Sequence, residues 1–162
     1  MNNIQSLQYF LPELLITITA LFVIVFDLIS QKKSNNLLVT VALFCIAWLL
    51  YQLPSNGGEI FNGMLINDKF SFYFKWIIFI STGSVILVSK YSNELDKEYK
   101  AEFDALILFV LLGMFLMTNS IDLLMIYLSI ELVSIPSYVL AGMLKNDKKS
   151  NVLFCLELTK FE

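Results

Sequence analysis

The stretch Ile121 to Leu144, IDLLMIYLSIELVSIPSYVLAGML, decides the fold, because it has the composition of one long apolar helix with a carboxylate in its middle. The 22 residues from Leu123 to Leu144 would form a helix of about 33 Å, enough to cross a hydrocarbon core of ~30 Å. Glu131 lies near the centre of that span. An ionised carboxylate alone at mid-membrane costs on the order of 3 kcal/mol, so we expect Glu131 to face protein or water rather than lipid.

Most polar side chains of this helix fall on one narrow stripe when residues are placed at 100° intervals, with mainly Leu, Ile, Val and Met around the remainder. The stripe holds Ser120, Tyr127, Glu131, Ser134, Tyr138 and Lys145. Pro136 has no N–H to bond the carbonyl of Leu132, so we expect a kink and a freed carbonyl beside the charge. A buried acid next to a loosened backbone indicates proton handling.

The composition predicts an all-α integral membrane protein. Hydrophobic residues make up 57% of the 162 residues, charged residues make up 15%, and the mean hydropathy is +0.72. The sequence has no histidine, which excludes His-ligated haem, His-containing zinc sites and imidazole acid–base chemistry. Cys45 and Cys155 are far apart and lack metal or redox spacing. We expect both to be small buried hydrophobic residues, and we expect no metal site.

Hydrophobic runs separated by polar turns predict a bundle of about five transmembrane helices within residues 1–151. A cleavable signal peptide is not expected, because no Lys or Arg precedes the first run and no small-x-small site follows it. Gly113 should permit close approach of a neighbouring helix. The segment 54–68 contains PSNGG and is expected to be a loop that can pack on the outer surface as a small lid. The expected spans are about 10–29, 37–53, 70–88, 103–117 and 123–144.

Glu13, Asp27 and Lys75 are further charged residues within these spans. Glu13 and Asp27 lie near the two ends of the first span, where we expect each carboxylate to reach headgroups or water. Glu13 also gains from the positive end of the helix dipole. Lys75 lies one to two turns inside the third span, and we favour snorkelling to the headgroups over a role as a buried ion-pair partner.

The distribution of lysines supports five spans and predicts their orientation. With the N-terminus outside, the cytoplasmic segments are 31–36, 89–104 and 145–151, and the only lysine of the external loops is Lys69. With one span fewer or more, lysine-rich loops would lie on both sides of the membrane, and this positive-inside bias would be lost. The cytoplasmic lysines are Lys32, Lys33, Lys90, Lys97, Lys100, Lys145, Lys148 and Lys149.

Three segments carry a resemblance to a known family. The most specific is Leu128 to Pro136, LSIELVSIP, and the others are Glu102 to Phe109 and Asp68 to Phe74, in the same order and spacing as in the family. Over about residues 1–151 the chain resembles the N-terminal part of membrane subunit N, also called subunit 2, of respiratory complex I, the proton-pumping NADH:quinone oxidoreductase. The first segment is similar to the family's glutamate-Leu-x-Ser-x-Pro motif of the fifth helix. Related antiporter-like subunits and cation/proton antiporter complexes share the architecture.

The resemblance implies that Glu131 matches the family's fifth-helix glutamate, which pairs with an intramembrane lysine of a later helix. Proton translocation there is coupled to electron transfer from NADH to quinone. A lysine that approaches or leaves a desolvated carboxyl favours its charged or its neutral form, which is a gate for protons. Alternatively, Glu131 only joins two helices by hydrogen bonding. Tyr127, Ser134 and Tyr138 are candidates for lining a hydrated path, and equally for helix-packing hydroxyls, and Pro136 is the candidate kink.

We expect the chain itself to bind no cofactor and to have no independent catalytic activity, with NADH and quinone used by the complex. The expected partners are the antiporter-like and small membrane subunits of complex I and the lipid bilayer, not nucleic acid. The expected location is the bacterial plasma membrane, with an organelle inner membrane as the alternative. A non-enzymatic scaffold or assembly subunit, and a subunit of a related cation/proton antiporter, are the alternative functions.

The sequence departs from the family after Asn151. The family's subunits have about fourteen helices, and the lysines that partner the glutamate lie on helices that this chain does not contain. Val152 to Glu162, VLFCLELTKFE, is too short to cross a membrane and is expected to be a divergent or truncated tail, from an early stop, a shifted reading frame or a deliberate cut. We predict that the 162-residue chain alone does not complete a proton channel.

Overall fold

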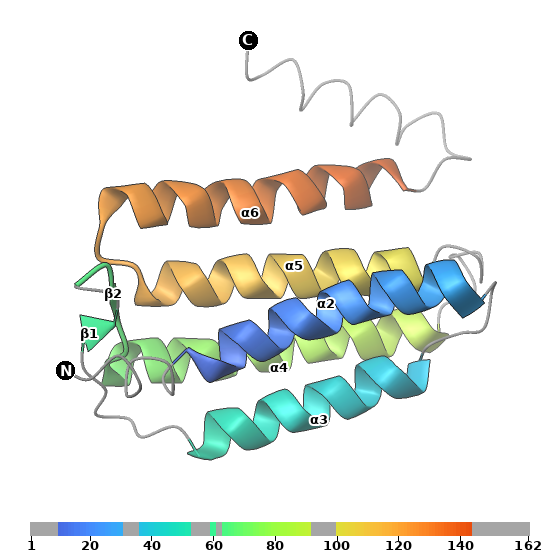
Figure 1. Ribbon diagram of the computed structural model, residues 1–162, viewed down its shortest axis with the longest axis horizontal. Coiled ribbons are helices and arrows are strands. Elements are labelled where there is room, and N and C mark those ends of the chain that lie inside the picture. Colours follow the sequence, from blue (N-terminus) through green and yellow to red (C-terminus); the bar gives the residue numbers. More distant parts are fainter. Residues whose placement is uncertain (1–9, 31–35, 53–58, 61–62, 92–99, 144–162) are drawn as a thin grey trace, which may run out of the picture.

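The structure is a computed structural model that describes residues 10–30, 36–52, 59–60, 63–91 and 100–143 (Figure 1). These residues form five helices and one two-stranded sheet. In chain order the elements are α2 (Leu11–Ser30), α3 (Asn36–Gln52), β1 (Glu59–Ile60), β2 (Leu65–Ile66), α4 (Lys69–Tyr91), α5 (Lys100–Asn119) and α6 (Leu123–Gly142).

The helices lie where the hydropathy predicts them, and the expected all-α membrane bundle is confirmed. Helix α5 begins at Lys100 rather than near residue 103, because the residues before its apolar run are good helix formers and Glu102 lies in its first turn. Helix α4 likewise ends three residues later than predicted, at Tyr91. Three helices, α4, α5 and α6, are long and apolar enough to cross a membrane. The apolar segments Leu11–Phe26 of α2 and Val39–Gln52 of α3 are shorter.

Helix α5 is the centre of the bundle. It packs against α6, α2 and α4, whereas α3 lies at the edge against α2 and α4. Successive helices alternate in direction, so that α2, α4 and α6 all begin at the end of the bundle where α5 terminates and where β1 and β2 lie (Figure 1). We call this end the hairpin end.

The core of the bundle is apolar, but α4 also buries several polar side chains while many of its large apolar residues lie on the outside. The buried side chains of α4 include Ser71, Lys75, Thr82 and Ser89. The exposed ones include Phe70, Tyr73, Ile77, Ile80 and Val88. A bundle that is surrounded by hydrocarbon has no need to hide its apolar side chains, and its polar groups must find partners inside. This distribution therefore agrees with a membrane environment.

The segment expected to be a loop contains a small antiparallel hairpin. Glu59 pairs with Ile66 and Ile60 pairs with Leu65, and Gly63 in the connection has a φ of 88°, a left-handed conformation that favours glycine. Leu65 also forms a bridge with Ser120, and the N–H of Ile121 donates to the carbonyl of Met64 at 3.2 Å. The hairpin is therefore attached to the turn between α5 and α6.

Close packing of α5 against α6 depends on Gly113, as predicted. A Cβ placed on Gly113 would lie 2.7 Å from Cγ2 of Val133, 3.1 Å from the nitrogen of Val133 and 3.2 Å from the carbonyl oxygen of Ser129. Because two of these atoms belong to the backbone of α6, a larger residue would push the helices apart. The face of α6 that packs on α5 is thereby fixed.

Candidate functional site

Glu131 lies near the middle of α6, on the face that points away from α5. Ser129 and Pro136 are the buried residues of this helix, and Ser129 is part of the contact with Gly113. Glu131 follows Ser129 by two residues, which is about 200° around a helix. Its side chain is only partly buried. The principal neighbour of α6 in the described part of the chain is α5, so the face of Glu131 has no helix packed closely against it there.

The predicted polar stripe is present in its central part. Tyr127 is 61% exposed, and its side chain lies within hydrogen-bonding reach of the Glu131 carboxylate. The hydroxyl of Ser134 donates to the carbonyl of Ile130 at 2.8 Å, within its own helix. Tyr138 lies about two turns beyond Glu131 on the same side. We call Tyr127, Glu131, Ser134 and Tyr138 the Glu131 face.

The two ends of the stripe differ from the prediction. Ser120 lies before α6 in the α5–α6 turn, where its hydroxyl donates to the carbonyl of Leu116 at 2.6 Å, so its assignment to the stripe is wrong. Lys145 lies outside the described residues, as does the tail 152–162. Helix α6 continues without a break through Pro136, which is buried. The kink at Pro136 stays a prediction.

The most deeply buried charges of the described residues are Glu13 of α2 and Lys75 of α4. Oε1 of Glu13 lies 2.6 Å from Nζ of Lys75, and both side chains are 0% exposed. Nδ2 of Asn119, the last residue of α5, donates to the same Oε1 at 3.1 Å. Nζ of Lys75 also lies 5.8 Å from the centre of the Phe115 ring, a cation–π contact. We call Glu13, Lys75 and Asn119 the buried ion-pair cluster, which joins three helices.

This cluster corrects two predictions from the sequence. Glu13 was expected to reach headgroups or water, and Lys75 was expected to snorkel, yet each is the buried partner of the other. The reason is geometric: α2 and α4 begin at the same end, and helix side chains lean toward the N-terminus, which brings the Lys75 ammonium back toward the level of Glu13. In the sequence, the opposite charges of Glu13 and Lys75 near the starts of two spans that run in the same direction could have indicated this ion pair. Asn119 was not among the predicted site residues, and the side chain of Asp27 lies outside the described ones.

Asp68 caps α4 at the hairpin end, outside the membrane-spanning segment. The backbone N–H of Ser71 donates to Oδ1 of Asp68 at 2.7 Å, and this hydrogen bond lowers the pKa of Asp68 from its usual value of 3.8. The hydroxyl of Ser71 donates to the carbonyl of Thr118 at 2.7 Å. The start of α4 is thus tied to the end of α5, beside Asn119.

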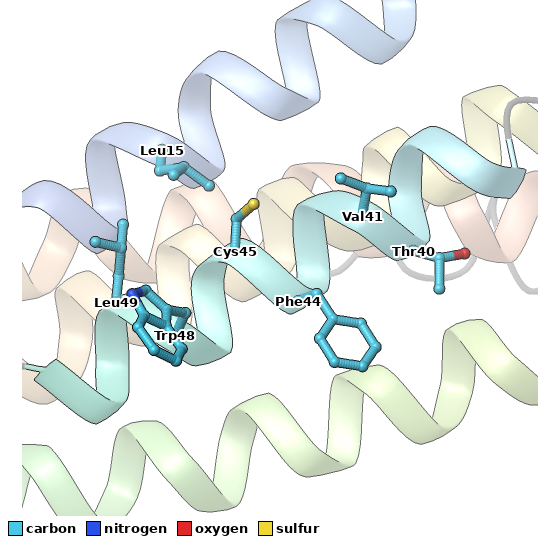
Figure 2. Close-up of a pocket in the computed structure, with 7 residues that line it drawn as sticks. All are labelled: Leu15, Thr40, Val41, Phe44, Cys45, Trp48 and Leu49. Carbon is cyan, nitrogen blue, oxygen red and sulfur yellow. The ribbon is translucent and has the colours of Figure 1, made fainter.

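A groove of about 540 Å³ lies along α3, with Leu15 of α2 on its far wall (Figure 2). Phe44 and Trp48 of α3 are 77% and 64% exposed. Cys45 is also exposed, so the prediction that it is buried is wrong, because α3 packs through one face only at the edge of the bundle. Cys155 lies outside the described residues. The lining residues are Leu15, Thr40, Val41, Phe44, Cys45, Trp48 and Leu49, a surface suited to hydrocarbon.

Among the described residues, no group of three or more His, Cys, Asp or Glu side chains could hold a metal ion. The two groups of polar side chains that we consider for chemistry are the Glu131 face and the buried ion-pair cluster. Both can accept or release protons, and neither offers a ligand set for a redox centre.

Comparison with known proteins relates the chain to one kind of membrane subunit. It is 37% identical over 154 residues to the NADH-quinone oxidoreductase subunit N of Anaeromyxobacter sp. (strain Fw109-5), and 39% identical over 163 residues to the subunit N 2 of Sorangium cellulosum (strain So ce56). This chain is a homologue of NADH-quinone oxidoreductase subunit N. A further relative is the NAD(P)H-quinone oxidoreductase subunit 2, chloroplastic, of Mesostigma viride, at 34% identity over 145 residues. The resemblance predicted from the sequence is confirmed.

The relation to subunit N covers nearly all of this chain but a minor part of each relative. The three alignments cover 92%, 93% and 87% of the chain, and 30%, 32% and 29% of the respective relatives. The chain thus spans about 30% of the length of the curated relatives it matches. No family model matches the chain.

Proposed function

We propose that this chain is part of a membrane subunit of a proton-pumping NADH:quinone oxidoreductase, in which Glu131 takes part in proton translocation. The names of the subunit N relatives and the apolar helices support this function. The observation that carries the role of Glu131 is its position: a carboxylate at the middle of a membrane-length helix, on a face without a closely packed helix in the described part of the chain. Such a group is costly against lipid and needs a polar neighbour.

The rest of a subunit of the relatives' length is the natural cover for the Glu131 face. The relatives extend to about three times the length matched here, so further helices are available to pack on α6. A cation on one of them, opposite Glu131, would compensate the carboxylate. The family resemblance predicts a lysine in that position.

The geometry of the Glu131 face suits a group that gains and loses a proton. When a cation lies close, the carboxylate stays charged, and when the cation moves away, desolvation favours the protonated acid. The Tyr127 hydroxyl, within reach of the carboxylate, can hold it in position or pass a proton to it. Ser134 and Tyr138 extend the polar surface along the same face.

NADH and quinone would be used by other parts of the complex, and the partners would be its other membrane subunits and the lipid bilayer. The hairpin end would lie outside, with the N-terminus. The alternation of the helices supports this orientation, because Lys69 begins α4 at the hairpin end whereas Lys100 begins α5 at the opposite, lysine-rich end.

A role as a non-enzymatic scaffold subunit is the second candidate. The buried ion-pair cluster favours it, since this bundle does use charged side chains to join helices. Glu131 would then only fix the docking of a neighbouring helix, and its protonation would be irrelevant.

Replacement of Glu131 in the full-length subunit within its complex separates the two functions. We expect Glu131→Gln to abolish most NADH-driven proton pumping while the complex assembles normally, because glutamine keeps the size and hydrogen bonding but cannot ionise. Glu102→Gln is the matched control, since Glu102 is exposed in the first turn of α5. Failed assembly of the Glu131 variant supports the scaffold, and normal assembly with normal pumping excludes the proposed proton role.

A further inference from the structure

The buried ion-pair cluster has more hydrogen-bonding groups than its own side chains satisfy. Oε2 of Glu13 and Oδ1 of Asn119 are fully buried and have no hydrogen-bond partner among the described residues. Apart from its contact with Oε1 of Glu13, the Lys75 ammonium has no hydrogen-bond partner there either, although it carries three donors. The cluster thus presents two free acceptors next to free donors.

This set of groups matches the bonding of a buried water molecule. Such a water typically makes about three hydrogen bonds to polar groups that would otherwise be unsatisfied. It can accept one from the Lys75 ammonium and donate one each to Oε2 of Glu13 and Oδ1 of Asn119. All of these buried groups would then be used, as in the great majority of protein interiors.

We propose that Glu13, Lys75 and Asn119 bind an internal water molecule, and that this hydrated ion pair is a second proton-exchange site of the chain, besides Glu131. A water between a carboxylate and an ammonium connects an acid and a base directly, and it can carry a proton from one to the other. The proton-exchange part of this inference rests on the proposed function, whereas the water-binding part does not.

The cluster lies close to one end of the bundle, and so close to the aqueous phase. Glu13 lies in the first turn of α2, and Asn119 is the last residue of α5, so the cluster lies near the hairpin end rather than at mid-bundle. Asn67, one residue after β2, is also fully buried, and neither its Nδ2 nor its Oδ1 has a partner among the described residues. The hairpin end therefore holds a further buried amide with capacity for water.

The two sites lie on different sides of the α5–α6 pair. The cluster lies where α2, α4 and α5 meet, and the Glu131 face points away from α5. A change in one site is therefore separable by mutation from a change in the other, because no residue is shared.

Radiolytic hydroxyl-radical footprinting of the assembled complex tests the bound water, because radicals form from water held beside a side chain. Phe115 is the reporter, since it is 0% exposed and its ring lies beside Lys75. We expect oxidation of Phe115 in the unchanged protein, and loss of that oxidation in the apolar double variant Glu13→Leu/Lys75→Met. Absence of Phe115 oxidation in the unchanged protein would overturn the water site without any variant being needed.

Proton exchange is tested with the double variant Glu13→Gln/Lys75→Gln, which keeps polar atoms for a water but has no ionisable group. We expect Phe115 oxidation to persist and NADH-driven pumping to be lost at retained quinone reduction. Unchanged pumping would overturn the proton role. If this variant does not assemble, the exchanged pair Glu13→Lys/Lys75→Glu replaces it, with pumping expected to be retained, and an assembled complex that no longer pumps would count against the proposal.

The variant Glu131→Gln, measured in the same assays, distinguishes failure of the proposed role of Glu131 from failure of the water site. If the inference is right, Phe115 oxidation is the same in Glu131→Gln as in the unchanged protein, whatever happens to pumping. Normal pumping in Glu131→Gln refutes the proposed role of Glu131 but does not affect the water site. Absence of Phe115 oxidation in the unchanged protein refutes the water site but does not affect the proposed role of Glu131.

Discussion

At the scale of single residues, the strongest prediction concerns the pair Glu13 and Lys75. Lys75→Met leaves a carboxylate buried without its counter-charge, which should lower the free energy of unfolding by about 3–5 kcal/mol. The measurement is thermal unfolding of the purified protein in detergent. Lys69→Met is the control, because Lys69 is exposed at the start of α4 and its loss should change stability by no more than ~0.5 kcal/mol.

The double variant Glu13→Leu/Lys75→Met tests whether the unpaired buried charge causes the destabilisation of Lys75→Met. Removing both charges together leaves no unpaired ion, so its stability should lie close to that of the unchanged protein and above that of Lys75→Met. If Lys75→Met unfolded at the same temperature as the unchanged protein, the pair would not be buried as the structure has it.

Asp68 gives a prediction with a pH dependence. Asp68→Ala removes the acceptor for the Ser71 N–H and should destabilise the protein by about 1 kcal/mol at neutral pH. Because the pKa of Asp68 is lowered from 3.8 on folding, this contribution is fully present above pH 3.8 and is lost as the pH falls through the folded-state pKa. Denaturation at several pH values should show the difference between the two proteins shrinking in acid.

Asp122 is the natural control for the capping prediction. It occupies the N-cap of α6, but its side chain makes no capping hydrogen bond. Asp122→Ala should therefore lower the stability at neutral pH by less than Asp68→Ala does. An equal loss in both variants would mean that general electrostatics at the hairpin end, not the Ser71 hydrogen bond, stabilises α4.

Single residues also show where sequence reasoning reached its limit. Glu131 was singled out because an acid in the middle of an apolar helix is costly against lipid, and its role in proton translocation stays a prediction. Glu13 and Lys75 were misassigned because each lies close enough to a span end to reach water, and only the packing of α2 against α5 and of α4 against α5 closes that exit. The burial of a side chain near a helix end depends on its neighbours, and a single sequence does not contain them.

At the scale of elements, Gly113 and Gly83 form a matched pair. Gly113→Ala should destabilise the protein by about 1–3 kcal/mol, because the new methyl group meets the backbone of α6 at Val133 and Ser129. Gly83→Ala meets no atom within 4 Å and should stabilise α4 by up to ~1 kcal/mol. Thermal unfolding of the two variants in detergent would show opposite shifts, and equal shifts would contradict the α5–α6 packing.

The elements themselves could be predicted well, with one exception. Hydropathy located all five helices within a few residues, because length and apolar composition are local properties. The hairpin at β1 and β2 was expected to be loop, because each strand has only two residues and its stability comes from the bridge between Leu65 and Ser120, which are distant in sequence. Such pairings are tertiary, and turn residues alone do not reveal them.

At the scale of the whole molecule, the exposed face of α6 predicts that this chain alone does not conduct protons. A purified chain in proteoliposomes with an internal pH-sensitive dye should show the same proton permeability as empty liposomes. The reason is that Glu131 lacks a packed opposite wall in the described part of the chain, so no enclosed path surrounds it. Protein-dependent proton flux would show that the chain completes a path by itself.

The central claim is that Glu131 is shielded from lipid in the assembled subunit, and spin-label accessibility tests it most directly. A label at Glu131→Cys in the full-length subunit is compared with one at Ile77→Cys, which is 62% exposed on the outer face of α4. We predict that label 131 collides weakly with lipid-dissolved oxygen and more strongly with a water-soluble nickel complex, the reverse of label 77. Equal, strong oxygen collision at both positions would contradict the account.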